Sequence, residues 1–329
     1  MTPLISVVVV NFNGKTFLDD CLSALAHQTF RDFEVILVDN GSSDGSADYV
    51  RERYPFVILV ETGKNLGFAG GTNAGIHAAQ GVFIFTLNND TIADPHLFEE
   101  IIKPMQINPC VGMCGAKMLF PDGRINSTAI CISRSGAAWD RGMGESDQGQ
   151  YDRPEEIFGP CGGAALYRRK MLDDIGLFDE DFFLFMEDVD LAFRGRLAGW
   201  TCRYVPTARV VHCHGGTAGF RSDLSIYYGN RNLIWYTVKT FPLQLLLLSI
   251  PWIIGRNCSV IPFYLFQGRG RVIIRAELDM IRGIPRMIRK RREVKRRVPA
   301  GSVEKWIRCW SRVSSGSRSP WRQGSRGLE

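Results

Sequence analysis

The chain has 329 residues, of which 45% are hydrophobic and 22% are charged. This composition excludes an intrinsically disordered chain, a collagen-like repeat and a small disulfide-stabilised protein. The charge is uneven: residues 268–329 hold 18 Lys and Arg against 5 Asp and Glu (+13), which leaves 22 against 29 (−7) for residues 1–267. The acidic body argues against nucleic-acid binding, and the basic C-terminal stretch indicates contact with an anionic membrane surface.

The cysteines indicate a reducing compartment. They number nine, an odd count, and nowhere form Cys-x-x-Cys, so we expect reduced thiols of the kind found in the cytoplasm. The apolar run at residues 4–10 is too short for the hydrophobic part of a signal peptide. We interpret it as a buried strand instead.

Buried strands alternate with helical patterns through the first 90 residues. The strands are β-branched and apolar without alternation, which is typical of a parallel sheet covered on both faces. The expected strands are residues 4–10, 33–38, 56–60 and 82–87, and the expected helices are residues 15–27, 45–53 and 66–79. This alternation predicts an α/β fold with a doubly wound, mostly parallel sheet flanked by helices.

Polar clusters follow three of these strands, at residues 11–14, 39–44 and 88–90. Turn formation and helix capping could explain any one of them, but open α/β sheets bind ligands at the carboxyl ends of their strands. Residues 41–45 lack the Walker lysine, and the glycines of residues 67–71 do not follow the first strand. The pattern therefore predicts a nucleotide held through its base, its ribose and a metal-bridged diphosphate.

Candidate ligands for a divalent metal, Mn²⁺ or Mg²⁺, lie at the ends of two strands. Asp90 offers a hard carboxylate oxygen. His212 and His214 follow an apolar stretch and fall on one face if the chain stays extended. The alternative is that these histidines only pack or cap.

The densest acidic region is residues 178–200, where aromatic side chains precede Glu187, Asp188 and Asp190. Partial burial among aromatic rings would raise the pKa of a carboxylate toward the range of a general base. An acidic first turn favoured by the helix dipole could explain one or two of these acids but not the whole cluster.

These segments together resemble glycosyltransferase family 2, the inverting enzymes with the GT-A fold, and within it the bacterial rhamnosyltransferase-like group. The resemblance covers roughly residues 4–240. Its matching motifs are VVVVNFNG, VILVDNGSSDGS, NLGFAGGTNAGI, FTLNNDT, GPCGGAALYRR, FDEDFFLFMEDVDLAFRGRLAGW and YVPTARVVHCHGGT.

The resemblance implies a donor-binding pocket at the first three polar clusters. Asp39 matches the carboxylate that contacts the nucleotide base, Asp44 lies in the same loop, and Asn11 lines the pocket. The run Asn88, Asn89 and Asp90 matches the metal-binding Asp-x-Asp motif. Because Asn88 replaces the first acid of that motif, Asp90 becomes the principal metal ligand.

The resemblance also implies roles for later residues. Glu187 and Asp188 match the catalytic Glu-Asp pair, with Asp188 as the general base, and Arg194 matches a downstream arginine that we assign to donor binding. A histidine after the last strand often completes the metal site, and His212 fits best by spacing, with His214 as the alternative.

The implied reaction is a single displacement with inversion at the anomeric carbon. The donor would be a nucleotide sugar, dTDP-rhamnose or a UDP-sugar, and the acceptor a saccharide or polyprenyl-linked saccharide of a bacterial surface polysaccharide. An inactive nucleotide-sugar-binding scaffold at the membrane is the alternative from another functional class.

The C-terminal part is expected to form a helical, membrane-associated appendage. Residues 241–266 are long enough to span a bilayer but contain three prolines and Arg256, which favours an interfacial or re-entrant segment. The alternative is a soluble helical bundle with a basic face. We divide the chain into a catalytic domain (1–240), an apolar and basic helical region (241–310) and a disordered tail (311–329), located at the cytoplasmic face of the inner membrane.

Overall fold

The structure is a computed structural model that describes residues 2–213 and 222–308. Its first strands confirm the predicted alternation, because every expected strand and helix among the first 90 residues is present. They are β1 (Ile5–Asn11), α1 (Lys15–Ala26), β2 (Phe33–Asp39), α2 (Ser46–Arg53), β3 (Val57–Glu61), α3 (Gly67–Ala78) and β4 (Phe83–Asn88). His214 and the predicted disordered tail lie outside the described residues.

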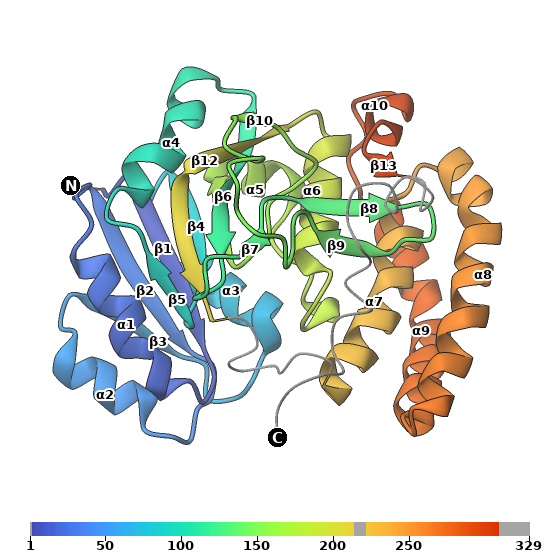
Figure 1. Ribbon diagram of the computed structural model, residues 1–329, viewed down its shortest axis with the longest axis horizontal. Helices are drawn as coiled ribbons and strands as arrows, with labels where there is room; N and C mark the ends of the chain where they lie inside the picture. The colour runs from blue at the N-terminus through green and yellow to red at the C-terminus, as the bar shows by residue number, and fades with distance from the viewer. Residues whose placement is uncertain (1, 214–221, 309–329) are drawn as a thin grey trace.

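One large sheet crosses the molecule, in the order β10-β12-β6-β11-β4-β1-β2-β3 (Figure 1). Its later strands are β6 (Val111–Leu119), β10 (Glu155–Glu156), β11 (Ala164–Arg168) and β12 (Thr201–His212), with β5 (Thr91–Ala93) paired to β12 and β7 (Ile125–Ser127) paired to β6. Along the main path only β11 and β10 run antiparallel to their neighbours. The predicted mostly parallel sheet is therefore confirmed.

The register of the parallel strands aligns the polar clusters. Asn11, at the end of β1, is the pairing partner of Asp39 at the end of β2. On the other side of β1, Val10 pairs with Asn88 at the end of β4. Because parallel strands all end at the same edge, three clusters far apart in the sequence lie side by side.

Helices cover both faces of the sheet. Successive side chains of a strand point to opposite faces, and both sets are apolar here, so each face must be buried. Val7 and Val9 of β1 face a cluster with α1 and α4 (Leu97–Ile107), whereas Val8 faces a cluster with α3. That second cluster also contains side chains of α5 (Arg169–Ile175) and α6 (Glu187–Leu197). Both faces of the sheet are therefore buried, which explains why its strands show no polar alternation.

The C-terminal helices form a layer at one end of the molecule (Figure 1). They are α7 (Asp223–Thr240), α8 (Leu243–Phe266), α9 (Gly270–Arg291) and the short α10 (Gly301–Glu304). Beside them lies a small sheet of β8 (Ile130–Ser133), β9 (Ala138–Asp140) and β13 (Ile307–Arg308). Met280 and Met287 of α9 belong to the same hydrophobic cluster as side chains of α6 and α7. The hydrophobic core therefore continues beyond residue 240.

Buried charges join this layer to residues 179–190. Lys239 on α7 is only 4% exposed and lies 2.7 Å from Asp179 and 2.9 Å from Asp190. Lys290 on α9 also binds Asp179, at 2.5 Å. Burial opposes ionisation of Asp179, but Lys239 and Lys290 hold the pKa of this carboxyl well below its ordinary value. The stabilisation is therefore present above the ordinary Asp pKa and lost as the pH falls below it.

We expect Lys239→Ala to lower the free energy of unfolding by about 3 kcal/mol, the lower end of the cost of breaking a buried ion pair, because Lys290 still neutralises Asp179. Lys103→Ala is the control, since its pair with Glu100 is half exposed, and it should cost less than about 1 kcal/mol. Urea denaturation measures both, and the difference between them should shrink below about pH 4. Equal losses in the free energy of unfolding for the two variants would contradict a stabilising role for the buried ion pairs of Lys239.

Candidate active site

The pocket at the ends of β1 and β2 contains an acid with an unused oxygen. Asp39 is 5% exposed, and its Oδ2 accepts a hydrogen bond from the backbone N–H of Ser42 at 3.1 Å. Its Oδ1 is buried and has no hydrogen-bond partner in the part of the chain that the structure describes. Beside it, the Asn11 amide donates to Ser42 Oγ at 3.3 Å. A buried carboxylate oxygen without a donor is costly, which makes it a good acceptor for a ligand N–H.

Asp44 lies in the same loop but uses its carboxylate within the protein. It accepts hydrogen bonds from the backbone N–H groups of Lys15 (2.9 Å) and Ser46 (3.0 Å), the first residues of α1 and α2. Burial tends to raise its pKa, but the bonds from Ser46 and Lys15 outweigh it and lower the pKa. Asp44 thus fixes two helix N-termini next to Asp39.

The run after β4 connects this pocket to β12. Asn89 Nδ2 donates to Asn11 Oδ1 at 2.7 Å, and Asn88 Nδ2 lies 3.1 Å from His212 Nε2. Asp90 Oδ1 is 3.2 Å from the same His212 nitrogen. The last residue of β12 is therefore brought to the end of β4, so Asn88, Asp90 and His212 form one cluster.

Asn126 orients the His212 ring. Its Oδ1 lies 3.0 Å from His212 Nδ1, so a hydrogen on Nδ1 completes this bond and leaves the Nε2 lone pair facing Asp90. Asn88 can donate to this Nε2 atom, and a cation bound between Nε2 and Asp90 Oδ1 would also stabilise two acceptor atoms that lie 3.2 Å apart. Within residues 2–213 and 222–308, no group of three or more His, Cys, Asp and Glu side chains could hold a metal ion. Further ligands for a metal would have to come from substrate oxygens.

The acidic pair occupies the start of α6. Asp188 Oδ2 accepts a hydrogen bond from the backbone N–H of Gly162 at 3.0 Å, and Oδ1 accepts from that of Val189 at 2.8 Å. Burial raises the Asp188 pKa despite these bonds. Burial, and then the charge of Asp188, raise the Glu187 pKa well above its ordinary value. Glu187 Oε2 is buried without a hydrogen-bond partner.

Gly162 and Gly163 connect the acidic pair to the cluster at β4. Gly162 binds Asp188, and the Gly163 carbonyl accepts from the backbone N–H of Asn88 at 3.0 Å. A Cβ atom on Gly163 would lie 3.0 Å from the Asn88 amide, so glycine permits this close approach. The two glycines therefore link the start of α6 to the end of β4.

The backbone before the acidic pair is strained. Phe183, Phe185 and Met186 have φ values of 65°, 66° and 71°, in the left-handed region that costs non-glycine residues about 1–3 kcal/mol each. The Phe183 carbonyl accepts from the backbone N–H of Ala69 at 3.2 Å. Such strain persists only where the surroundings impose it, and it is common at functional sites.

The structure does not bring Arg194 to the donor pocket. Its Nε donates to Asp190 at 2.7 Å. Its other nitrogens donate to backbone carbonyls of residues 175–177 at 2.7–2.9 Å. The guanidinium is 6% exposed and holds the chain that leads into the acidic segment.

Asp140, at the end of β9, is an acid that the sequence analysis missed. Its Oδ1 accepts from Ser127 Oγ at 2.5 Å. Burial raises its pKa to about 6; the charge of Asp188 adds to this and that of His212 opposes it, which places Asp140 between the two halves of the site. No sequence motif around Asp140 predicts this position, because these contacts join residues on different elements.

Comparison with known proteins identifies the family. The family model described as "Glycosyl transferase family 2" matches residues 6–176, more than half of the chain. The chain belongs to this family. The family and the enzyme class expected from the sequence are thereby confirmed.

A relative from Mycobacterium tuberculosis is named N-acetylglucosaminyl-diphospho-decaprenol L-rhamnosyltransferase. It is 31% identical over 243 residues, which cover 67% of this chain and 79% of that protein. The O-antigen biosynthesis protein RfbC of Myxococcus xanthus is 27% identical over 68% of this chain, but over only 18% of its own length. The predicted similarity to bacterial rhamnosyltransferases is confirmed.

Solved structures confirm the GT-A fold. The mannosyltransferase PcManGT from Pyrobaculum calidifontis, in complex with GDP-Man and Mn²⁺, has a TM-score of 0.56 at 17% identity and covers 93% of this chain and 88% of that one. GalNAc-T7 with UDP, GalNAc and Mn²⁺ has a TM-score of 0.59 at 16% identity, over 71% of this chain and 48% of that one.

Proposed function

We propose that the enzyme is an inverting, metal-dependent rhamnosyltransferase that transfers rhamnose from dTDP-rhamnose to a lipid-linked saccharide during synthesis of a bacterial surface polysaccharide. The observation that carries the proposal is that β2 and β4, which lead into Asp39 and Asp90, end at the same side of the sheet, and that Gly162 and Gly163 link Asp188 to the end of β4. The similarity to the mycobacterial rhamnosyltransferase supports the sugar and the acceptor class.

The donor nucleotide would lie at the ends of β1 and β2. The Oδ1 atom of Asp39 suits the imide N–H that thymine and uracil share, so it would accept either base and leave the choice between dTDP and UDP to other contacts. Asn11, Asn88 and Asn89 would line the pocket. Asp44 would act by fixing the loop, and Arg194 by holding the segment behind the site rather than by touching the donor.

Asp188 would act as the general base. Its carboxylate accepts the proton of the acceptor hydroxyl while that oxygen attacks the anomeric carbon from the face opposite the nucleotide, which inverts the configuration. The Gly162 N–H orients this carboxylate, and its raised pKa makes it a stronger base than an exposed aspartate. Glu187, protonated beside it, would avoid a second negative charge in the same buried space.

The donor set fits a divalent cation, Mn²⁺ or Mg²⁺. Asp90 and His212 would hold it, with His214 as the alternative histidine, and a substrate diphosphate would supply further oxygens. When bound, such a cation neutralises charge on the departing nucleoside diphosphate. Asn126 keeps the His212 Nε2 lone pair directed to this position.

The enzyme would work at the cytoplasmic face of the plasma membrane, on an anionic surface. The mycobacterial relative is named for a diphospho-decaprenol acceptor, and a polyprenyl-linked acceptor would be confined to the bilayer. One described helix, α8, is long and apolar enough to cross a membrane.

We expect the purified enzyme with Mn²⁺ to transfer rhamnose from dTDP-rhamnose to a polyprenyl-diphosphate saccharide. Asp188→Asn should lower kcat by about 10²–10⁴ and leave donor affinity intact, because an amide keeps the size but accepts no proton. The wild-type rate should rise with pH through a pKa above the ordinary Asp value, since the base acts unprotonated.

Assays with a panel of nucleotide sugars, together with donor titration calorimetry, measure these effects. Asp173→Asn, an exposed acid on α5, is the matched control and should be fully active. Preference for a UDP-sugar would overturn the rhamnosyl assignment alone. Near-normal turnover by Asp188→Asn would overturn the assignment of the base.

We expect Asp90→Ala to remove the Mn²⁺ dependence of donor binding, because Asn88 and Asn89 offer only neutral oxygens to a cation. In calorimetry, the variant should bind the donor with the same weak affinity with and without Mn²⁺. The wild type should bind the donor more tightly when Mn²⁺ is present. Asp122→Ala, an exposed turn acid, provides the control. If Asp90→Ala binds the donor in Mn²⁺ as tightly as the wild type, then Asp90 only shapes the turn.

A further inference from the structure

Helix α8 leaves most of its apolar surface uncovered. Only Leu245 and Ser249 of this helix are buried. In its most apolar stretch of 18 residues, 11% of the residues are buried inside the protein. Its large exposed side chains are Leu243, Leu247, Leu248, Ile250, Trp252, Ile254, Phe263, Leu265 and Phe266. Soluble monomers rarely expose a continuous apolar surface of this kind, so it indicates an interaction site.

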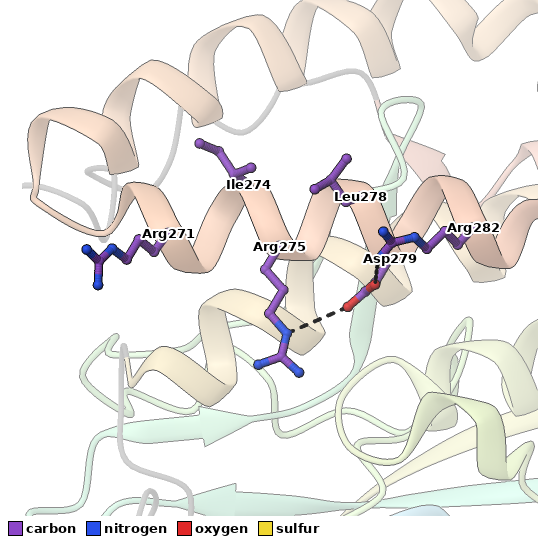
Figure 2. A pocket seen from close by; sticks show the side chains of 6 residues that line it. All are labelled: Arg271, Ile274, Arg275, Leu278, Asp279 and Arg282. Atoms are coloured by element: carbon purple, nitrogen blue, oxygen red, sulfur yellow. Dashed lines mark hydrogen bonds and ion pairs between the residues drawn. The ribbon is translucent and has the colours of Figure 1, made fainter.

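Helix α9 extends this surface and adds charge to it. Ile274, Leu278, Ile281 and Ile288 are about half exposed and recur at helical spacing, while the opposite face is buried against α7. Four arginines recur beside this stripe: Arg271, Arg275, Arg282 and Arg289. Arg275 and Arg282 share one acid, Asp279, at 3.8 Å and 2.8 Å, so the row keeps a net positive charge. Figure 2 shows Ile274 and Leu278 on one side of α9 and Arg275 on another, around a hollow of about 440 Å³.

The contacts of α8 decide how it can meet a bilayer. Arg256, in the middle of α8, donates to Asn230 of α7 at 2.7 Å. The next helix, α9, packs beside α8 and is tied to the catalytic half through Arg286, which lies 2.6 Å from Asp181 (Figure 1). A membrane-spanning α8 would break these contacts and place Arg256 near the bilayer centre, which is costly.

We propose that α8 and α9 form a docking surface for an anionic phospholipid bilayer, with α8 lying in the plane of the interface. The exposed apolar side chains enter the acyl boundary, and the arginine row binds lipid phosphates. This inference rests on the proposed function, because the surface would hold the active site against the bilayer that contains the lipid-linked acceptor.

Flotation of the full-length chain tests the surface without any need for activity. The intact chain should bind vesicles that contain phosphatidylglycerol more tightly than vesicles of phosphatidylcholine. The triple variant R271Q/R275Q/R282Q should lose about fivefold in affinity for each arginine, with the same control change at Arg31, Arg51 and Arg153 having no effect. L247E/I254E should abolish flotation, whereas I107E, an exposed apolar position on α4, should not.

Further measurements separate the other arrangements. Alkaline carbonate should release the chain, and quenching of Trp252 fluorescence by brominated lipids, taken as the difference from Trp252→Phe, should be strongest for shallow labels. Resistance to carbonate with deep quenching would mean that α8 spans the membrane. Concentration-dependent dimerisation without flotation would mean that a second copy covers the surface. Either result overturns the docking proposal. Donor titration of the same samples tests the proposed function separately, so failure of one can be told from failure of the other.

A second observation concerns the strained backbone before the acidic pair. The amide nitrogen of Asn232, on α7, donates to three backbone carbonyls of that segment, those of Phe182 (2.8 Å), Leu184 (2.9 Å) and Phe185 (2.8 Å). One helix turn earlier, Tyr228 stacks on Phe183 with ring centroids 5.1 Å apart. α7 therefore imposes the conformation from which α6 begins.

We infer that Asn232 is a positioning residue for Asp188, which rests on the proposed role of Asp188 as the base. Without the amide, the positive-φ residues Phe183, Phe185 and Met186 relax and the start of α6 turns away from Gly162. Asn232 touches neither the donor pocket nor the metal cluster, so the loss falls on the proton transfer and not on donor binding.

Asn232→Ala should lower kcat at least tenfold with an unchanged donor KM, and it should move the pKa of the pH–rate profile toward the ordinary Asp value as Asp188 becomes solvated. Asn230→Ala is the matched control, because this neighbouring buried amide donates to Ile226 and not to the segment. Should Asn232→Ala fail to fold, Tyr228→Leu removes only the ring stacking and should change kcat in the same direction. An unshifted pH profile, or equal effects of the two asparagine variants, would overturn the inference.

Discussion

The in-register parallel pairing of β1 with β2 and β4 is the constraint on which the site depends. It places Asn11 opposite Asp39 and brings Asn88 alongside, at an edge where the strands end and backbone groups no longer pair. A shift by one residue in either ladder would turn these side chains into one of the two apolar layers, where an unpaired carboxylate is costly. Burial of both sheet faces thus fixes the position of the polar edge as well as the core.

The acids of this site are held in different ways. Asp44 is satisfied by two helix N-termini, and Asp179 by two lysines, so each has a lowered pKa and supports the fold. Among the residues that the structure describes, Asp188 and Glu187 have no cationic partner, and burial raises their pKa values. Hydrogen bonds and ion pairs therefore separate the carboxylates that stabilise the protein from those left available for chemistry.

The C-terminal layer has two faces with different tasks. Its inner face belongs to the hydrophobic core and carries the lysines and asparagine that contact residues 179–190. Its outer face consists of exposed apolar side chains and arginines on α8 and α9. Because the same helices contribute both faces, the position of the outer surface relative to the acidic pair is set by packing and not by a linker.

The sequence alone determined the order of strands and helices, since apolar β-branched runs and polar strand ends are local patterns. Motifs of a few residues also led to the prediction that Asp39, Asp90 and Asp188 are functional acids. Tertiary structure alone decided that Arg194 binds carbonyls of residues 175–177, that Asn126 orients His212 and that Asp140 joins the site. It likewise decided that α9 shares the core of residues 1–240, although its sequence is strongly basic. The physical reason is that these features depend on contacts between residues tens of positions apart, which hydrophobic periodicity and short motifs do not encode.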